Sequence, residues 1–214
     1  LHNNLGMLYL RTRRYAEAEK YLKKAIQLDS TGAKAYDVLG IVYTRTHRYE
    51  EAEKNFKKAI RFDSTIINPY NHLGSIYSTS HRYDEAEKYY KNAIEYNLFD
   101  TDYAIFNRST SLGLIGKNSL KVKLLKQLVA DYSKSSYYDD ALYGLAKYYK
   151  NTAKYDLANK YYDDVILASS NQDFKADSYL SKGMIAFNRG QVEVAIEGFL
   201  FVVNNYQHSK YFKE

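Results

Sequence analysis

The side chains that most often bind metals or act as nucleophiles are few in this chain, and they are not spaced for either task. The sequence of 214 residues contains no cysteine, which excludes disulfides, thiol nucleophiles and cysteine-based zinc sites. No two of its five histidines stand four residues apart, the spacing that places two imidazoles on one helical face. These histidines are His2, His47, His72, His81 and His208. We therefore expect neither a metal nor a cofactor.

A glycine-containing segment and the acidic side chains do not form a predicted catalytic site either. Gly116 and Lys117 give residues 113–119 a faint likeness to a phosphate-binding loop. Such a loop needs a further glycine where this sequence has Ser111, and it needs a preceding strand. No carboxylate is expected in an apolar setting that would shift its pKa for acid or base work. We predict no catalytic residue and expect that the chain is not an enzyme.

The positive charge of the chain does not predict a nucleic-acid partner. The formal net charge is +6, and its densest cluster is Arg11, Arg13 and Arg14. Nucleic-acid modules usually concentrate such charge in a larger patch or stripe. We interpret the cluster as a solvated turn between two helices. The longest apolar run, 199–203, is far too short to cross a membrane, so no transmembrane segment is predicted.

The elements that carry these residues are set by an internal repeat. The segment RYAEAEKYLKKAI at 14–26 returns as RYEEAEKNFKKAI at 48–60 and as RYDEAEKYYKNAI at 82–94, an offset of 34 residues each time. A period of this length indicates stacked supersecondary units. The whole chain contains a single proline, which favours helix nearly throughout.

Each unit is predicted to be a pair of amphipathic helices. In the second unit, the small residues Gly40 and Ala52 should let the two helices approach closely, and Phe56 should fill the space beyond them. Glutamate and lysine four residues apart predict ion pairs on the exposed faces of the second helices. These pairs are Glu19–Lys23, Glu53–Lys57 and Glu87–Lys91.

The spacing of aromatic, small and apolar residues resembles the tetratricopeptide repeat (TPR). The first unit shows this pattern at Leu5, Gly6, Tyr9, Tyr15, Ala18, Leu22 and Ala25, and the third at Tyr70, Leu73, Gly74, Tyr77, Tyr83, Ala86, Tyr90 and Ala93. The closing proline of the family is replaced by Ser30, Ser64 and Leu98. The resemblance implies an all-α fold, a right-handed α-solenoid of about six stacked helix-turn-helix repeats.

The pattern continues in altered form beyond residue 98. The small residue of each first helix stands at 6, 40, 74, 109, 146 and 183, so the steps lengthen from 34 to 35 and 37 residues. We therefore divide a continuous solenoid into units 1–3 (residues 1–98) and units 4–6 (residues 99–214). The endings at 131–135 and 205–209 resemble those of envelope-type TPRs, found in outer-membrane assembly lipoproteins and in the periplasmic coordinator of the Tol system. Because Leu1 already lies inside a predicted helix and 210–214 would begin a seventh unit, we expect a fragment of a longer array.

In this family the first helix of each unit lines a concave groove that holds partner peptides. The resemblance places the following residues on that groove: Asn3, Met7, Leu10, Arg11, Lys34, Asp37, Ile41, Thr44, Arg45, Asn68, Asn71, Ser75, Ser78, Thr79, Tyr143, Lys147, Lys150, Leu180, Met184 and Phe187. Our predicted partner-binding residues are Met7, Arg11, Asp37, Ile41, Arg45, Asn71, Ser75, Tyr143 and Lys147. Family members that clamp the carboxylate tail of chaperones use lysine, asparagine and arginine at positions occupied here by Asn3, Met7, Val38, Asn68 and His72. Because the required cations are missing, a chaperone-tail clamp is not expected.

Three functions follow from the resemblance. The first is a scaffold that binds a partner peptide or helix in the groove without catalysis. The second is a structural component of a bacterial cell-envelope assembly or secretion complex, and the third is the regulatory TPR region of a larger signalling protein. The residues leave the compartment open between the cytoplasm and the periplasm or outer membrane of a bacterium.

Overall fold

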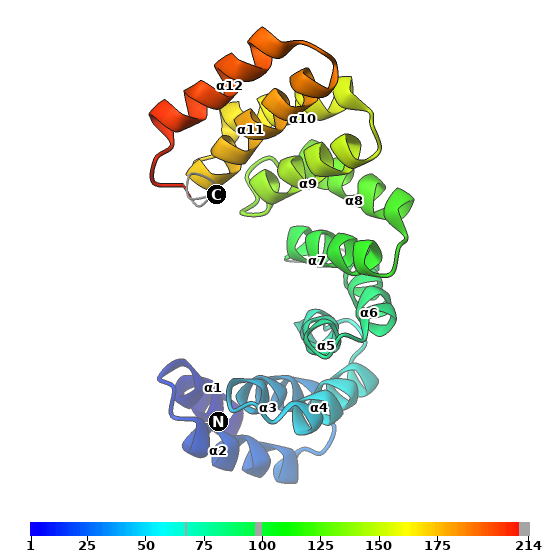
Figure 1. Cartoon of the computed structure of the whole chain (residues 1–214). Helices are drawn as coiled ribbons and strands as arrows, with labels where there is room; N and C mark the ends of the chain where they lie inside the picture. The colour runs from blue at the N-terminus through cyan, green and yellow to red at the C-terminus, as the bar shows by residue number, and fades with distance from the viewer. Residues whose placement is uncertain (67, 97–99, 210–214) are drawn as a thin grey trace. The chain divides into compact units, whose positions relative to one another are not determined.

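The computed structural model describes residues 1–66, 68–96 and 100–209 (Figure 1). Within these ranges the chain forms twelve α-helices and no strand, and consecutive helices from α1 to α7 and from α9 to α12 pack against one another, which confirms the predicted all-α solenoid. The helices are α1 (His2–Arg11), α2 (Tyr15–Leu28), α3 (Ala33–Arg45), α4 (Tyr49–Phe62), α5 (Asn68–Thr79), α6 (Tyr83–Glu95), α7 (Thr101–Leu114), α8 (Asn118–Asp131), α9 (Tyr138–Asn151), α10 (Tyr155–Ala168), α11 (Gln172–Asn188) and α12 (Val192–Asn205).

The helices fall into two compact units. The first compact unit, Leu1–Asn118, contains α1 to α7, and the second, Ser119–Glu214, contains α8 from its second residue onward and α9 to α12. The change of repeat type that the sequence predicts at 98/99 lies in residues 97–99, outside the described residues, as does the replaced proline position Leu98. Residues 210–214, expected to begin a seventh unit, also lie outside them. These expectations stay predictions.

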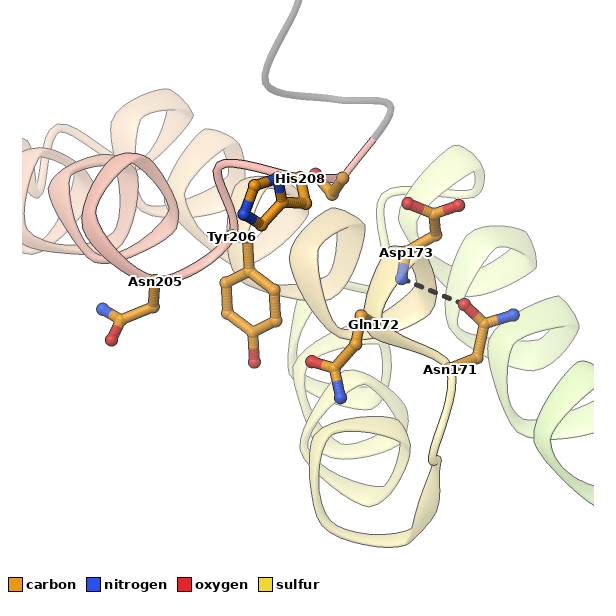
Figure 2. A pocket seen from close by; sticks show the side chains of 7 residues that line it. Asn171, Gln172, Asp173, Asn205, Tyr206 and His208 are labelled. Atoms are coloured by element: carbon orange, nitrogen blue, oxygen red, sulfur yellow. Dashed lines mark hydrogen bonds between the residues drawn. The ribbon is translucent and has the colours of Figure 1, made fainter.

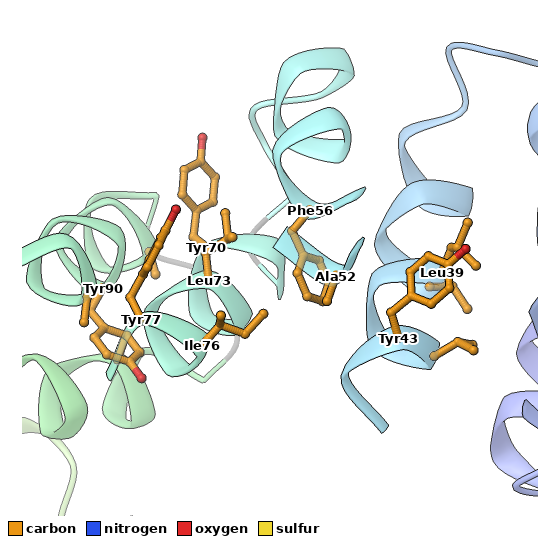
Figure 3. Close-up of a cluster of buried hydrophobic side chains, with 14 of the residues drawn as sticks. Leu39, Tyr43, Ala52, Phe56, Tyr70, Leu73, Ile76, Tyr77 and Tyr90 are labelled. Atoms are coloured by element: carbon orange, nitrogen blue, oxygen red, sulfur yellow. The ribbon is translucent and has the colours of Figure 1, made fainter. Parts of the chain in front are cut away.

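Small residues allow the two helices of each early repeat to touch. A Cβ atom added to Gly40 of α3 would lie 2.6 Å from the ring of Phe56 in α4, and one added to Gly74 of α5 would lie 2.7 Å from the ring of Tyr90 in α6. Figure 3 shows Phe56 and Tyr90 inside the continuous apolar core that neighbouring repeats share. The predicted role of Gly40 and Phe56 is thus confirmed, because the aromatic ring lies directly on the glycine.

Tyrosines of the first helices bind the preceding repeat. The hydroxyl of Tyr43 in α3 donates a hydrogen bond to Glu19 of α2 at 3.1 Å, and Tyr77 in α5 donates to Glu53 of α4 at 2.8 Å. Both aromatic rings are buried, so the tyrosines combine apolar packing with a bond to a charged acceptor. The repeat period therefore places the same contact at both junctions.

Two of the three predicted Glu–Lys pairs are present. Glu19 contacts Lys23 at 2.7 Å, and Glu53 contacts Lys57 at 2.6 Å. The third prediction was wrong. Glu87 pairs instead with Arg108 of α7 at 2.7 Å, and Lys91 pairs with Glu95 at 3.5 Å. At this junction the carboxylate of Glu87 is therefore bound by the guanidinium of Arg108, whereas the earlier junctions use a tyrosine hydroxyl.

In the second compact unit, α9 packs on α10 and α11, and α11 packs on α12. Leu125 of α8 lies against Gly144 of α9, where an added Cβ would be 3.2 Å from the leucine side chain. The last helix, α12, leaves Val194, Ile196 and Leu200 each more than half exposed. None of the described helices is both long and apolar enough to span a membrane.

Candidate functional site

The first helices of the early repeats form a row, in which α3 contacts both α1 and α5. This first-helix row carries seven of the nine residues predicted to bind a partner, namely Met7, Arg11, Asp37, Ile41, Arg45, Asn71 and Ser75. Along α3, Asp37, Ile41 and Arg45 follow at four-residue spacing and therefore share one face. At the rise of an α-helix, Asp37 and Arg45 are separated by about 12 Å along the axis. An acceptor, an apolar side chain and a cation thus line one face in order.

Three amide or carboxyl side chains repeat at the same position of the row with buried, unpartnered oxygens. The Oδ1 atoms of Asn3, Asp37 and Asn71 are buried and have no hydrogen-bond partner among the described residues. These residues are 34 positions apart, like the repeat itself. As whole residues, Asp37 is only 6% exposed and Asn71 only 8%. A buried acceptor without a partner destabilises a fold by about 1–3 kcal/mol, so the recurrence of such acceptors requires an explanation.

Asp37 departs from what the sequence predicts for the carboxylates. Burial raises the pKa of Asp37 to about 7, although the nearby Lys34 ammonium opposes the effect. The expectation that no carboxylate would occupy an apolar setting was therefore wrong. The row explains the error, because the neighbouring first helices α1 and α5 contact α3 and exclude water from a position that the periodicity assigns to an open groove.

A second feature is a hollow of about 770 Å³ at the end of the row where the first helices turn into the second helices. We call it the arginine pocket. Its lining is Leu10, Arg11, Arg13, Tyr15, Ile41, Thr44, Arg45, His47 and Tyr49. Four basic side chains thus surround an interior that also has aliphatic and aromatic walls. Arg11, Ile41 and Arg45 were among the predicted binding residues, whereas Arg13, His47 and the two tyrosines were not.

The pocket residues that the sequence did not predict lie in, or two residues after, turns with an unusual backbone conformation. Arg13 and His47 have positive φ angles of 58° and 60°, and His81 occupies the equivalent turn with a φ of 58°. Non-glycine residues adopt this left-handed region rarely. The Nδ1 atom of His47 lies 3.0 Å from the hydroxyl of Tyr49, and His81 repeats the contact with Tyr83 at 2.7 Å. In the sequence, His47 and His81 occupy equivalent positions of the repeat, but this pattern indicated only an exposed turn and not a pocket.

His72 of α5 lies beside this face and is half-buried. Its ring stacks on Phe56 with the centroids 4.9 Å apart. Burial and, to a lesser degree, the positive charge of Arg45 lower the pKa of His72 to about 4. The imidazole is therefore neutral at physiological pH, and it acts as a packing residue of the core.

Comparison with protein families decides the identity of the repeat. Models of the tetratricopeptide repeat match residues 1–64, 67–100 and 140–169. The chain is a tetratricopeptide repeat protein. The family assignment inferred from the residue spacing is confirmed. A comparison with functionally curated proteins finds no match.

Solved TPR structures share this fold. PilF of Pseudomonas aeruginosa matches with a TM-score of 0.71 and 20% identity, over 97% of this chain and 91% of its own. YrrB, described as a TPR protein with an unusual peptide-binding site, matches with a TM-score of 0.71 and 18% identity, over 86% and 91%. PilW, described as a widely conserved type IV pilus biogenesis factor, matches with a TM-score of 0.65 and 20% identity, over 98% and 94%. At these identities the likeness establishes the TPR fold alone.

The remaining two predicted binding residues, Tyr143 and Lys147, lie in α9 of the second compact unit and contact other residues of the TPR fold. Tyr143 of α9 stacks on Phe174 of α11 with the ring centroids 4.5 Å apart, and its hydroxyl donates to Asp177 at 2.7 Å. The ammonium of Lys147 lies 5.2 Å from the centre of the Tyr143 ring. Tyr143 thus joins neighbouring TPR units, and its contact with a partner stays a prediction, as does that of Lys147.

A smaller TPR hollow of about 310 Å³ lies where α12 ends beside the start of α11 (Figure 2). Two of its polar side chains, Asn171 and Asn205, already bond to the backbone of their own helices. The side chain of Asn171 accepts hydrogen bonds from the backbone N–H of Asp173 at 2.9 Å and of Phe174 at 3.3 Å, and so caps α11. Within the described ranges, no three His, Asp or Glu side chains gather where they could hold a metal ion. The row and the arginine pocket remain the stronger candidates.

Proposed function

We propose that this TPR chain is a non-catalytic scaffold that holds a partner protein by an extended segment or a helix laid along the first-helix row. The observation that carries the proposal is the set of unpartnered acceptors of Asn3, Asp37 and Asn71. An extended segment offers backbone N–H groups, and a side chain of the partner can offer a cation or a hydroxyl. Turning these side chains outward toward such donors would relieve the cost of burying them unpaired.

Cross-linking can test whether the partner occupies this face. A photoreactive amino acid is placed at Ile41 or Ser75 on the row, and at exposed Lys20 or Lys88 on the second helices as matched controls. We expect adducts, identified by mass spectrometry in the native organism, from the row positions and not from the controls. Adducts from the second-helix positions alone would contradict the proposal.

The double variant Arg45→Glu with Asn71→Ala tests the same face by affinity. We expect it to weaken binding of the cross-linked partner while the helical circular dichroism signal stays unchanged. Both side chains lie on the row, so their loss removes a cation and an acceptor without touching the aromatic core. Unaltered affinity in a titration would overturn the assignment of these residues.

A second candidate function is a structural role in a bacterial envelope assembly. It is supported by the endings at 131–135 and 205–209, and by the likeness to PilF and PilW, of which the latter is described as a type IV pilus biogenesis factor. Fractionation of cells that produce the native protein tests it. Recovery in the outer-membrane or periplasmic fraction supports this role, and recovery in the cytoplasm refutes it.

A further inference from the structure

We propose that the arginine pocket takes carboxylate side chains of an acidic segment of the partner, an inference that rests on the proposed scaffold function. The pocket gathers Arg11, Arg13, Arg45 and His47 around about 770 Å³. Guanidinium groups bind carboxylates through paired N–H donors in a fixed geometry, which gives both strength and orientation. The row would hold the partner segment, and the pocket would select for acidic side chains in one part of that segment.

The arginines of this region fall into two groups that differ in their partners. In each of the first three repeats, the arginine that precedes the second helix is paired. Arg14 contacts Glu17 at 2.6 Å, Arg48 contacts Glu19 at 2.9 Å, and Arg82 contacts Glu85 at 2.8 Å. Those three arginines therefore belong to the scaffold.

The pocket arginines lack such pairing. Across the described part of the chain, no carboxylate forms an ion pair with Arg11, Arg13 or Arg45, and all three are exposed. They line a hollow to which no carboxylate of the described residues contributes. An external anion is the ligand that this arrangement fits.

The walls of the pocket favour a peptide over a nucleic acid. Leu10, Ile41 and Tyr15 line the same hollow as the arginines, and they match the aliphatic parts of peptide side chains. The line of unpaired cations also ends after two repeats, because the position of Arg11 and Arg45 is occupied in the third repeat by Thr79. Nucleic-acid binding normally relies on a longer basic stripe that follows the phosphate backbone.

Fluorescence anisotropy on the full chain can test the pocket directly. The probes are a short fluorescein-labelled peptide rich in glutamate and aspartate, the same peptide with every acid replaced by its amide, and labelled polyuridine. The pocket variant is Arg11→Gln with Arg45→Gln. The matched control is Lys20→Gln with Lys88→Gln, which removes the same charge from exposed positions on the second helices.

We expect the acidic peptide to bind the unaltered chain at low salt, the pocket variant to lose at least about tenfold in affinity, and the control to change by less than about twofold. The amide peptide should not bind. Equal affinities of the two variants, no binding of the acidic peptide, or a preference for polyuridine would each overturn the pocket assignment.

The cross-linking experiment keeps the two proposals apart. If adducts still form from Ile41 and Ser75 while the acidic peptide ignores the pocket, the scaffold stands and the pocket assignment fails. If the peptide binds as expected but no row adduct forms, the pocket is real and the row is not its continuation.

Discussion

Replacing Asp37 by asparagine should stabilise the fold, and only above the pH at which the unfolded chain loses its aspartate proton. Burial raises the pKa of Asp37 from an ordinary value of 3.8 to about 7. Between about pH 4 and pH 7, the folded chain therefore still holds a proton on Asp37 that the unfolded chain has already released. Stability must fall as the pH rises through this window, and it stays reduced above pH 7.

The magnitude follows from the size of the pKa change. At ~1.4 kcal/mol for each unit of pKa, the ionised Asp37 lowers the free energy of unfolding by at most roughly 4 kcal/mol at pH 8. Asparagine keeps the shape and the acceptor oxygen but carries no charge. Asp37→Asn should thus raise the free energy of unfolding at pH 8 by about 1–4 kcal/mol and should change it little at pH 4.

Thermal and urea unfolding, followed by circular dichroism at pH 4, 6 and 8, measure the difference between the variant and the unaltered chain. His72 titrates in the same range, but both proteins contain it, so its effect cancels in the difference. Asp84→Asn serves as the control, because the Asp84 side chain is 74% exposed and forms its ion pair with Lys117 at the long distance of 3.6 Å. The control should change stability by less than about 1 kcal/mol at any pH.

Equal stabilisation by Asp37→Asn at pH 4 and pH 8 would refute the reasoning, because the effect would then not come from ionisation. A loss of stability at pH 8 would refute it as well. If Asp37 serves the partner, the stabilised variant should also bind that partner more weakly, a common trade-off at binding sites.

Three further predictions concern the scaffold. Gly40→Ala should lower the free energy of unfolding by about 1–3 kcal/mol in urea titrations, because the new Cβ meets the Phe56 ring. This cost should outweigh the better helix propensity of alanine, and a stabilised variant would contradict the packing. The unaltered chain should lose roughly 3 kcal/mol of stability as the pH falls from 6.5 toward 4, because the unfolded chain takes up a proton on His72 that the folded chain resists. His72→Gln should abolish this loss, and parallel pH profiles of the two proteins would argue against the assignment. Tyr77→Phe should cost about 1 kcal/mol in thermal unfolding by removing the hydrogen bond to Glu53, and an unchanged melting temperature would show that the bond contributes nothing net.

The repeat pattern alone predicted most of the scaffold. The small residue at Gly40, the ring at Phe56 and the pairs Glu19–Lys23 and Glu53–Lys57 follow from spacing within one helix pair, where the helical period determines which side chains meet. The exception was Glu87, whose partner Arg108 comes from the next repeat. Contacts between repeats depend on how helices stack, and the period within a single helix does not show that.

The candidate site was predicted less completely. The sequence assigned Arg11, Ile41 and Arg45 to a binding face, and the structure places all three around the arginine pocket. It did not predict that Arg13 and His47 would join them. Those two side chains reach the pocket from turns with positive φ, a backbone conformation that residue type normally disfavours and that only the folded turn shows.

The sequence by itself thus determined the repeat, its helix pairs and its family, because these depend on local periodicity and on residue size at fixed spacing. Only the tertiary structure decided the state of Asp37 and the freedom of the pocket arginines. The environment of Asp37 is created by neighbouring helices of other repeats. The distinction between paired Arg14 and unpaired Arg13, adjacent in the chain, depends on which carboxylates the fold brings within reach. Burial and ion pairing are properties of the assembled repeats, and periodicity alone cannot reveal them.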